Sequence, residues 1–152
     1  MSKENNDLAH SLNQLLNTTA NAREAYKNAS KNVHNKPLTL FFEDAANEHE
    51  HFAEKLKAEI EYLGEKPKEK TSFKSDSDRF WMDFASIITH RNESALLKAC
   101  RRAEEKTIEQ YDDTLRHERI SDEMKNSLHR QREYAVNQKK KVDELLSQYQ
   151  SE

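Results

Sequence analysis

Residues 38–64 read LTLFFEDAANEHEHFAEKLKAEIEYLG and carry the clearest helical pattern of the chain. Inward-facing positions recur there at spacings of four and three residues: Leu38, Phe42, Ala45, His49, Phe52, Leu56, Ile60 and Leu63. This spacing places all of them on one face of an α-helix. Gly64, the only glycine of the chain, follows directly, where helices commonly end. The segment therefore predicts an amphipathic helix over about residues 38–63, with His49 on its packed face.

Three further segments carry the same rhythm. Their stripes run from Leu8 to Val33, from Glu93 to Leu115 and from Met124 to Tyr149. Each stripe is long enough to span several helical turns on one face. We therefore expect long helices over about residues 7–33, 93–117 and 122–149, and we expect Ser121 to cap the last one.

The segments between these helices predict how they are connected. The first two helices and the last two are joined by links of a few residues, so each pair should form an antiparallel hairpin. Residues 65–77 have no apolar period and predict a solvated connection anchored by Phe73. A short helix should follow over about residues 78–89, capped by Asp76 or Ser77. Its apolar residues, which we expect to cap the bundle or to form a dimer contact, are Phe80, Trp81, Phe84, Ile87 and Ile88.

The composition agrees with a helical domain. Of the 152 residues, 34% are apolar and 35% are charged, and the chain has one glycine and two prolines. High charge with low hydrophobicity occurs in disordered chains, but regular apolar stripes favour helices with charged outer faces. The length predicts one domain over residues 1–152.

Charge and cysteine usage limit the classes of function. The net charge of −3 argues against a general nucleic-acid binder. Lone Cys100 cannot form an internal disulfide, which fits a reducing compartment. The polar N-terminus lacks an apolar signal core, and no segment approaches the roughly 20 apolar residues of a membrane span. We expect a soluble, cytoplasmic protein with no nucleic-acid or membrane partner.

Several passages carry a family resemblance. They are residues 52–56 (FAEKL) with 63–67 (LGEKP), residues 79–83 (RFWMD), residues 97–115 with Glu104 and Tyr111, and residues 25–29 (AYKNA). Over about Leu8 to Val142 the chain resembles a bacterial ferritin-like family described as a domain of unknown function, related by fold to ferritin and rubrerythrin. The resemblance implies an all-α, ferritin-like four-helix bundle, in which one long crossover joins two hairpins. It implies no reaction. The chain departs from the family pattern at Ala25, where glycine is usual, and at His49, where arginine is frequent.

A ferritin-like fold raises the question of a di-iron site. Such a site takes a Glu from each of two helices and a Glu-x-x-His pair from each of the other two. Residues 48–51 contain such a string, but at 100° per residue Glu48 lies roughly 70° and His51 roughly 130° from the centre of the packed face. The last helix offers Gln131 and Gln138 at its inward positions. We therefore expect no complete di-iron centre and no cofactor. The alternative is iron or another divalent metal on a reduced ligand set of Glu104, His49 and Glu48, with Cys100 as a further candidate.

The inward polar residues form the candidate site, and its main members are His49, Glu104, Gln131, Tyr26 and Tyr111. A buried carboxylate is costly unless it is hydrogen-bonded, so Glu104 should have a donor such as His49, Gln131 or a tyrosine hydroxyl. Two interpretations follow: a hydrogen-bond network that fixes the register of the helices, which we favour, or a functional polar pocket around Glu104.

Function is expected to be non-enzymatic. The sequence favours an accessory or stress-related bundle that acts by self-association, for example as a dimer, or through a protein partner that the residues do not identify. The alternative is a metal-binding protein or oxidoreductase of the ferritin–rubrerythrin type.

Overall fold

Five α-helices make up the described part of the chain, which in this computed structural model comprises residues 3–70, 79–90 and 92–150. They are α1 (Lys3–Asn32), α2 (Lys36–Tyr62), α3 (Arg79–Thr89), α4 (Glu93–Leu115) and α5 (Asp122–Gln150). All five predicted helices are confirmed. Their ends differ from the predicted ones by a few residues, most at the start of α1, and next at the start of α2 and the end of α4. The predicted anchor Phe73 and the predicted caps Asp76 and Ser77 lie outside the described residues.

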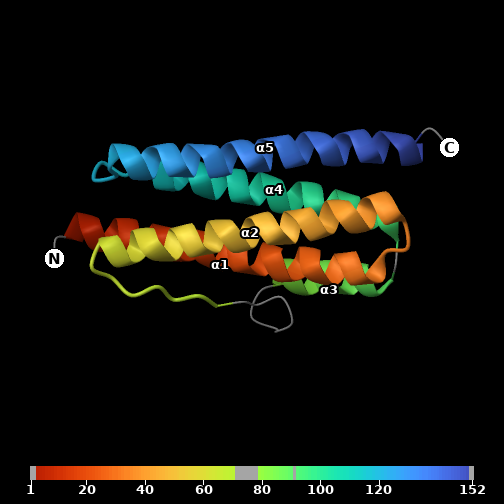
Figure 1. Cartoon of the computed structure of the whole chain (residues 1–152), viewed down its shortest axis with the longest axis horizontal. Helices are drawn as coiled ribbons and strands as arrows, with labels where there is room; N and C mark the ends of the chain where they lie inside the picture. The colour runs from red at the N-terminus through yellow and green to blue at the C-terminus, as the bar shows by residue number, and fades with distance from the viewer. Residues whose placement is uncertain (1–2, 71–78, 91, 151–152) are drawn as a thin grey trace.

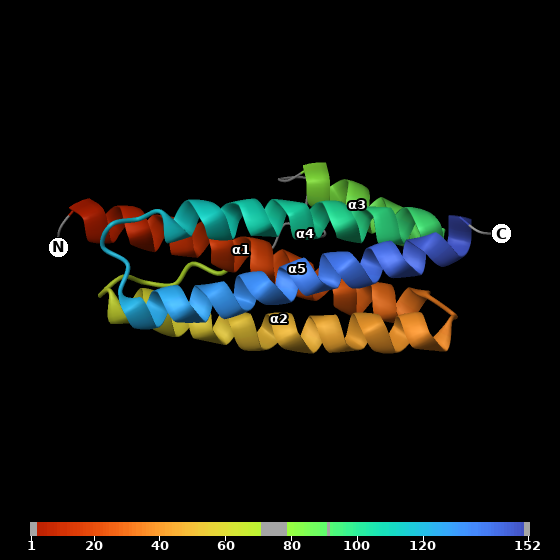
Figure 2. The ribbon, with the colours of Figure 1, turned by 90° about the horizontal axis from the view of Figure 1, so that it is seen from above.

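The two hairpins lie side by side to form a four-helix bundle (Figures 1 and 2). Helix α1 runs antiparallel to α2, and α4 runs antiparallel to α5, as the short links predict. Helix α4 packs against α1, and α3 packs against both of them from outside the bundle (Figure 2). One long crossover that carries α3 therefore joins the two hairpins, and this is the predicted connectivity.

The helix ends follow from local sequence. The Asn35 side chain accepts a hydrogen bond from the Leu38 amide at 3.1 Å, and Pro37 occupies the first turn of α2. Gly64 ends α2 with a φ of 80°, and Glu65 N–H bonds back to the Ile60 carbonyl at 3.2 Å. This is a Schellman cap, which favours glycine because its φ is positive. The predicted cap of the last helix is confirmed: Ser121 Oγ accepts from the Met124 amide at 3.2 Å.

The crossover begins as an exposed connection, as predicted, but polar side chains of the bundle also bind it. Asn13 Oδ1 accepts from the Lys68 amide at 2.7 Å, and Asn17 Oδ1 accepts from the Lys70 amide at the same distance. Glu69 also forms ion pairs with Arg23 at 3.1 Å and with Lys57. These polar side chains hold residues 65–70 along α1. The spacing of apolar residues could not predict this contact, because backbone amides of the crossover make the hydrogen bonds.

Two apolar clusters fill the bundle, one toward each end. The cluster at the end where α1 turns into α2 contains Tyr26, Phe42, Trp81, Phe84 and Leu97, among others. The opposite cluster includes Leu12, Leu15, Leu56, Tyr111 and Leu128. Trp81 is 1% exposed, because α3 lays its aromatic face along α1 and α4 instead of across the end of the bundle. Among the helices of residues 3–70, 79–90 and 92–150, none carries an apolar stretch that could span a bilayer.

Candidate functional site

A layer of buried polar side chains separates the two apolar clusters. Each of the four long helices contributes to it at the point where its apolar stripe is interrupted. The members of this polar layer are Thr19 from α1, His49 from α2, Glu104 and Thr107 from α4, and Gln131 and Gln138 from α5. The same spacing that packs the clusters therefore brings one or two polar positions of each long helix to the middle of the bundle.

The polar layer centres on Glu104, whose side chain is 1% exposed. The Tyr26 hydroxyl, which comes from α1, donates a hydrogen bond to Glu104 Oε1. Glu104 Oε2 has no hydrogen-bond partner among the described residues. Burial raises the pKa of Glu104 to about 7, and the Tyr26 hydrogen bond works in the opposite direction. Glu104 is therefore a carboxyl group that takes up its proton near neutral pH.

His49 faces the same layer without bonding to Glu104. Its Nδ1 lies 2.7 Å from the Ala45 carbonyl oxygen, so this nitrogen carries the proton and donates. The His49 ring meets the Tyr26 ring edge-on at 5.2 Å and the Tyr134 ring at 6.0 Å. Burial lowers the pKa of His49 to about 4, so the imidazole is neutral at pH 7. Tyr26 contacts both His49 and Glu104 and lies at the centre of the cluster.

A second hydrogen-bonded chain continues the layer toward the opposite cluster. Tyr111 donates to Gln131 Oε1 at 2.9 Å, and Gln131 Nε2 donates to Ser127 Oγ at 3.4 Å. Burial, with the nearby charge of Glu104, raises the pKa of the Tyr111 hydroxyl. The same two causes raise the pKa of the buried Cys100 thiol well above its usual range. Cys100 is thus a protonated core residue, as a thiol on an apolar stripe predicts.

The five predicted site residues all lie inside the bundle. Tyr26, His49, Glu104, Tyr111 and Gln131 are all buried, which confirms the inward positions read from the stripes. They form two hydrogen-bonded pairs, Tyr26 with Glu104 and Tyr111 with Gln131. Of the three donors expected for Glu104, a tyrosine hydroxyl is the one that bonds to it.

Glu48 does not join this cluster. It is exposed and lines a surface groove together with Asp44, Tyr134, Gln138 and Lys141. The alternative metal set of Glu104, His49 and Glu48 is therefore not assembled, because Glu48 projects from the border of the packed face toward solvent.

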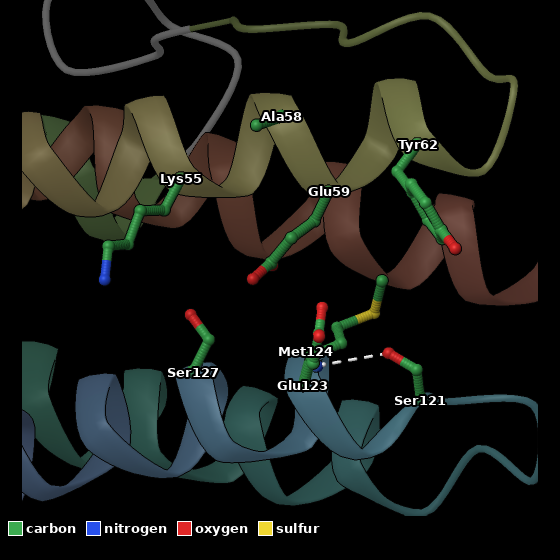
Figure 3. Close-up of a pocket in the computed structure, with 8 residues that line it drawn as sticks. All are labelled: Lys55, Ala58, Glu59, Tyr62, Ser121, Glu123, Met124 and Ser127. Atoms are coloured by element: carbon green, nitrogen blue, oxygen red, sulfur yellow. Dashed lines mark hydrogen bonds between the residues drawn. The ribbon is translucent and has the colours of Figure 1, made fainter.

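Glu59 is the residue that the sequence reasoning missed. Its Oε2 is buried and has no hydrogen-bond partner among the described residues. Burial raises its pKa to about 6, against the lowering effects of the Ser127 hydroxyl, Lys55 and Arg130. Its carboxylate points from α2 toward α5 into a groove of about 490 Å³ (Figure 3). The sequence feature that could have identified Glu59 is its position at the edge of the apolar stripe of α2, one residue before Ile60.

The polar layer does not fit the di-iron ligand set. In residues 6–70, 79–90 and 92–149, Glu104 is the only carboxylate residue that is buried, and no three described His, Cys, Asp or Glu side chains are grouped to hold a metal ion. Gln131 and Gln138 supply the α5 side of the layer, where the set needs a carboxylate. Glu59 is ten residues from His49, about 15 Å along α2, so it lies at another level of the bundle.

Known proteins resemble this chain in fold. The crystal structure of ferritin like, diiron-carboxylate proteins from Bacillus anthracis str. Ames superposes with a TM-score of 0.78. The match covers 96% of this chain and 99% of that chain at 22% sequence identity, and it shows that this chain has a ferritin-like fold. No curated protein matches the sequence. The model of the family described as a domain of unknown function (DUF2383) matches residues 7–117, and the chain belongs to this family.

Proposed function

We propose that this chain is a non-enzymatic ferritin-like bundle, an accessory or stress-related protein that acts by associating with a second copy or with another protein. The observation that carries the proposal is the hydrogen bond between Tyr26 and Glu104 in the middle of the bundle. It pairs Glu104, the one buried carboxylate residue in the ranges 6–70, 79–90 and 92–149, with a phenol instead of with further carboxylates. Ferritin-type chemistry requires several carboxylates and histidines at one level.

The polar layer has a structural role in this proposal. Tyr26 links α1 to Glu104 on α4, so the hydrogen bond joins the two hairpins. Ser11 and Thr114 join the same two helices through a hydroxyl contact of 2.7 Å. Because buried polar groups are costly when they lose their partners, such bonds favour one register of the hairpins over others.

The side of the bundle formed by α2 and α5 is where we place the association surface. The opposite side carries α3, which packs on α1 and α4. Two grooves of about 490 and 420 Å³ are lined by residues of α2 and α5. Two of the most exposed large apolar side chains, Leu40 at 50% and Tyr62 at 83%, also belong to α2. Tyr62 lines the larger groove, and exposed apolar residues of this kind are typical of surfaces that bind other molecules.

Metal analysis tests the non-metal part of the proposal. The protein is purified without chelator as wild type, as Glu104→Gln and as the matched variant Glu105→Gln, whose side chain is exposed. We expect iron, manganese and zinc well below one ion per chain in all three. One ion per chain in the wild type and in Glu105→Gln, lost in Glu104→Gln, would overturn the proposal.

Sedimentation velocity tests the association part. Self-association predicts a mass that rises with protein concentration and falls back toward the monomer in Leu40→Glu or Tyr62→Glu. A monomer at every concentration would restrict the proposal to a different protein as the partner.

The second candidate is a metal-binding protein or oxidoreductase of the ferritin–rubrerythrin type. It would hold iron or another divalent metal on Glu104 and His49, and Glu48, which is exposed in this structure, would have to turn inward to join them. The observation that favours it is Glu104 Oε2, a buried carboxylate oxygen with no hydrogen-bond partner among the described residues. The metal analysis above separates the two candidates.

A further inference from the structure

We propose that the groove between the last turns of α2 and the first turns of α5 binds a small organic ammonium ion, with Glu59 as its counter-ion. The residues that line this amine groove are Lys55, Ala58, Glu59, Tyr62, Ser121, Glu123, Met124 and Ser127. The site is separate from the polar layer around Glu104, and it does not depend on whether that layer holds a metal. It lies on the side of α2 and α5 where we place the association surface, so a bound copy would compete with the amine, and binding is measured at concentrations where the chain is monomeric.

The shape of the amine groove suits a small molecule. Its volume of about 490 Å³ lies in the range of ordinary ligand pockets. The Glu59 carboxylate and the Ser127 hydroxyl approach it from opposite helices (Figure 3). The Tyr62 ring lies toward one end, and the Met124 side chain extends between the two helices. The groove thus offers oxygen atoms at its centre and an aromatic ring and a thioether beside them.

The charges of the groove favour a cation at Glu59. Two carboxylates, Glu59 and Glu123, and one ammonium group, Lys55, belong to the lining. Lys55 and Arg130 both lower the pKa of Glu59, yet burial outweighs them. Glu59 Oε2 has no hydrogen-bond partner in the described part of the chain, so its ionised form is poorly compensated. A cation that enters the groove would stabilise that form.

The ligand should carry an apolar body beside its ammonium group. Ser127 Oγ accepts from Gln131 Nε2 at 3.4 Å, and its hydroxyl donates to Glu59, which leaves one lone pair for an N–H donor. Tyr62 is 83% exposed, so its ring face is available for stacking or for a cation–π contact. Met124 is a flexible side chain that adapts to apolar groups of different shapes. A primary amine on a short aromatic or aliphatic body satisfies all three residues.

Titration with 2-phenylethylamine tests the proposal, followed by calorimetry or by amide chemical shifts in nitrogen-15 NMR. Its ammonium group stays protonated below about pH 9. A carboxyl group with a pKa near 6 is about one-tenth ionised at pH 5, so the affinity should fall roughly tenfold from pH 8 to pH 5. The shifted amides should lie in the last turns of α2 and the first turns of α5.

Variants assign the binding to Glu59. Glu59→Gln should weaken binding at pH 8 by roughly tenfold and remove the pH dependence. Glu61→Gln, an equal charge change on the exposed face of α2, should leave the affinity unchanged. Tyr62→Ala should weaken the aromatic amine but not propylamine, and this exposed position keeps the test valid if Glu59→Gln folds poorly.

Four outcomes would overturn the proposal. They are the absence of saturable binding, equal affinity in Glu59→Gln, equal affinity for the neutral analogue 2-phenylethanol, and shifted amides far from the groove. A blocked lysine, acetylated and amidated, carries the same ammonium group in the form that a partner protein would present. If it binds more tightly than 2-phenylethylamine, the assignment to a small free amine is wrong.

Discussion

Glu104 and Glu59 are two glutamates on long helices of the same bundle, and burial raises the pKa of both. Their surroundings differ. Glu104 is enclosed in the polar layer and accepts a hydrogen bond from Tyr26 on another helix. Glu59 lines a groove and points across it toward α5 (Figure 3). The same side chain therefore joins two hairpins at one place and lies at the half-buried wall of an open groove at the other.

The two carboxylates also mark two different seams between the hairpins. The seam between α1 and α4 is closed by the hydrogen bond from Tyr26 and by the contact of Ser11 with Thr114, and α3 packs beside it. The seam between α2 and α5 carries the two grooves. A buried carboxylate thus stabilises the fold where a donor from the facing helix reaches it. It is available to a ligand where the facing helices stand apart.

The largest expected effect is on the pH dependence of folding stability. Glu104 and His49 contribute opposite dependences, which cancel in the wild type. Burial raises the pKa of Glu104 from 4.5 to about 7, so Glu104 favours folding most below pH 4.5, and this stability is lost as the pH rises through 7. Burial lowers the pKa of His49 from 6.5 to about 4, so His49 favours folding above pH 6.5, and this stability is lost as the pH falls through 4. Each shift corresponds to about 3 kcal/mol, with opposite sign. The wild type should therefore change little in stability between pH 4.5 and 6.5.

Urea unfolding of single variants at a series of pH values should reveal the two pH dependences of the free energy of unfolding separately. In Glu104→Gln, the free energy of unfolding should rise by about 3 kcal/mol from pH 4 to pH 6.5. In His49→Gln, it should fall by a similar amount from pH 4.5 to pH 7, with a smaller contribution of the same sign from Glu59. Parallel curves for both variants and the wild type would show that the polar layer is open to water.

A smaller effect is expected from the hydrogen bond itself. Tyr26→Phe keeps the ring and removes the donor, so Glu104 Oε1 loses its partner and, like Oε2, has none among the described residues. We expect a loss of about 1–3 kcal/mol in the free energy of unfolding at pH 8, and a smaller loss at pH 5, where Glu104 is neutral. Tyr62→Phe is the matched control, because its hydroxyl lies on an exposed ring, and it should change stability by less than about 0.5 kcal/mol. Equal losses in the two variants would contradict a special role of Tyr26.

The sequence predicted the helices and the members of the polar layer because both depend on the same spacing of four and three residues. An interruption of the apolar stripe by His49 or Glu104 is visible in the printed residues and implies burial directly. The partners within the layer could not be predicted, because the period fixes the face of each helix but not the height of one hairpin against the other. The donor to Glu104 therefore remained open among His49, Gln131 and a tyrosine.

Features at the edges of the stripes could not be predicted from the sequence, and the reason is different. Glu59 lies beside Ile60 at the border of the packed face, where a long side chain can turn inward or outward. Its burial depends on how far α5 stands from α2, and no pattern within one helix encodes that distance. The binding of residues 65–70 by Asn13 and Asn17 escaped likewise, because it uses backbone amides of the crossover.

The smallest expected effect concerns Glu59, the carboxylate that lines the open groove. Because burial raises its pKa to about 6, ionised Glu59 disfavours the folded state at pH 8, and a neutral amide should relieve this cost. The groove admits solvent, which screens the charge, so Glu59→Gln should stabilise the chain at pH 8 by less than about 1 kcal/mol and change nothing at pH 4. Glu61→Gln, on the exposed face of α2, should be neutral at both pH values. A clear loss of stability in Glu59→Gln at pH 8 would mean that a partner within the fold holds the carboxylate, as Tyr26 holds Glu104, and that the groove is not free to bind an ammonium ion.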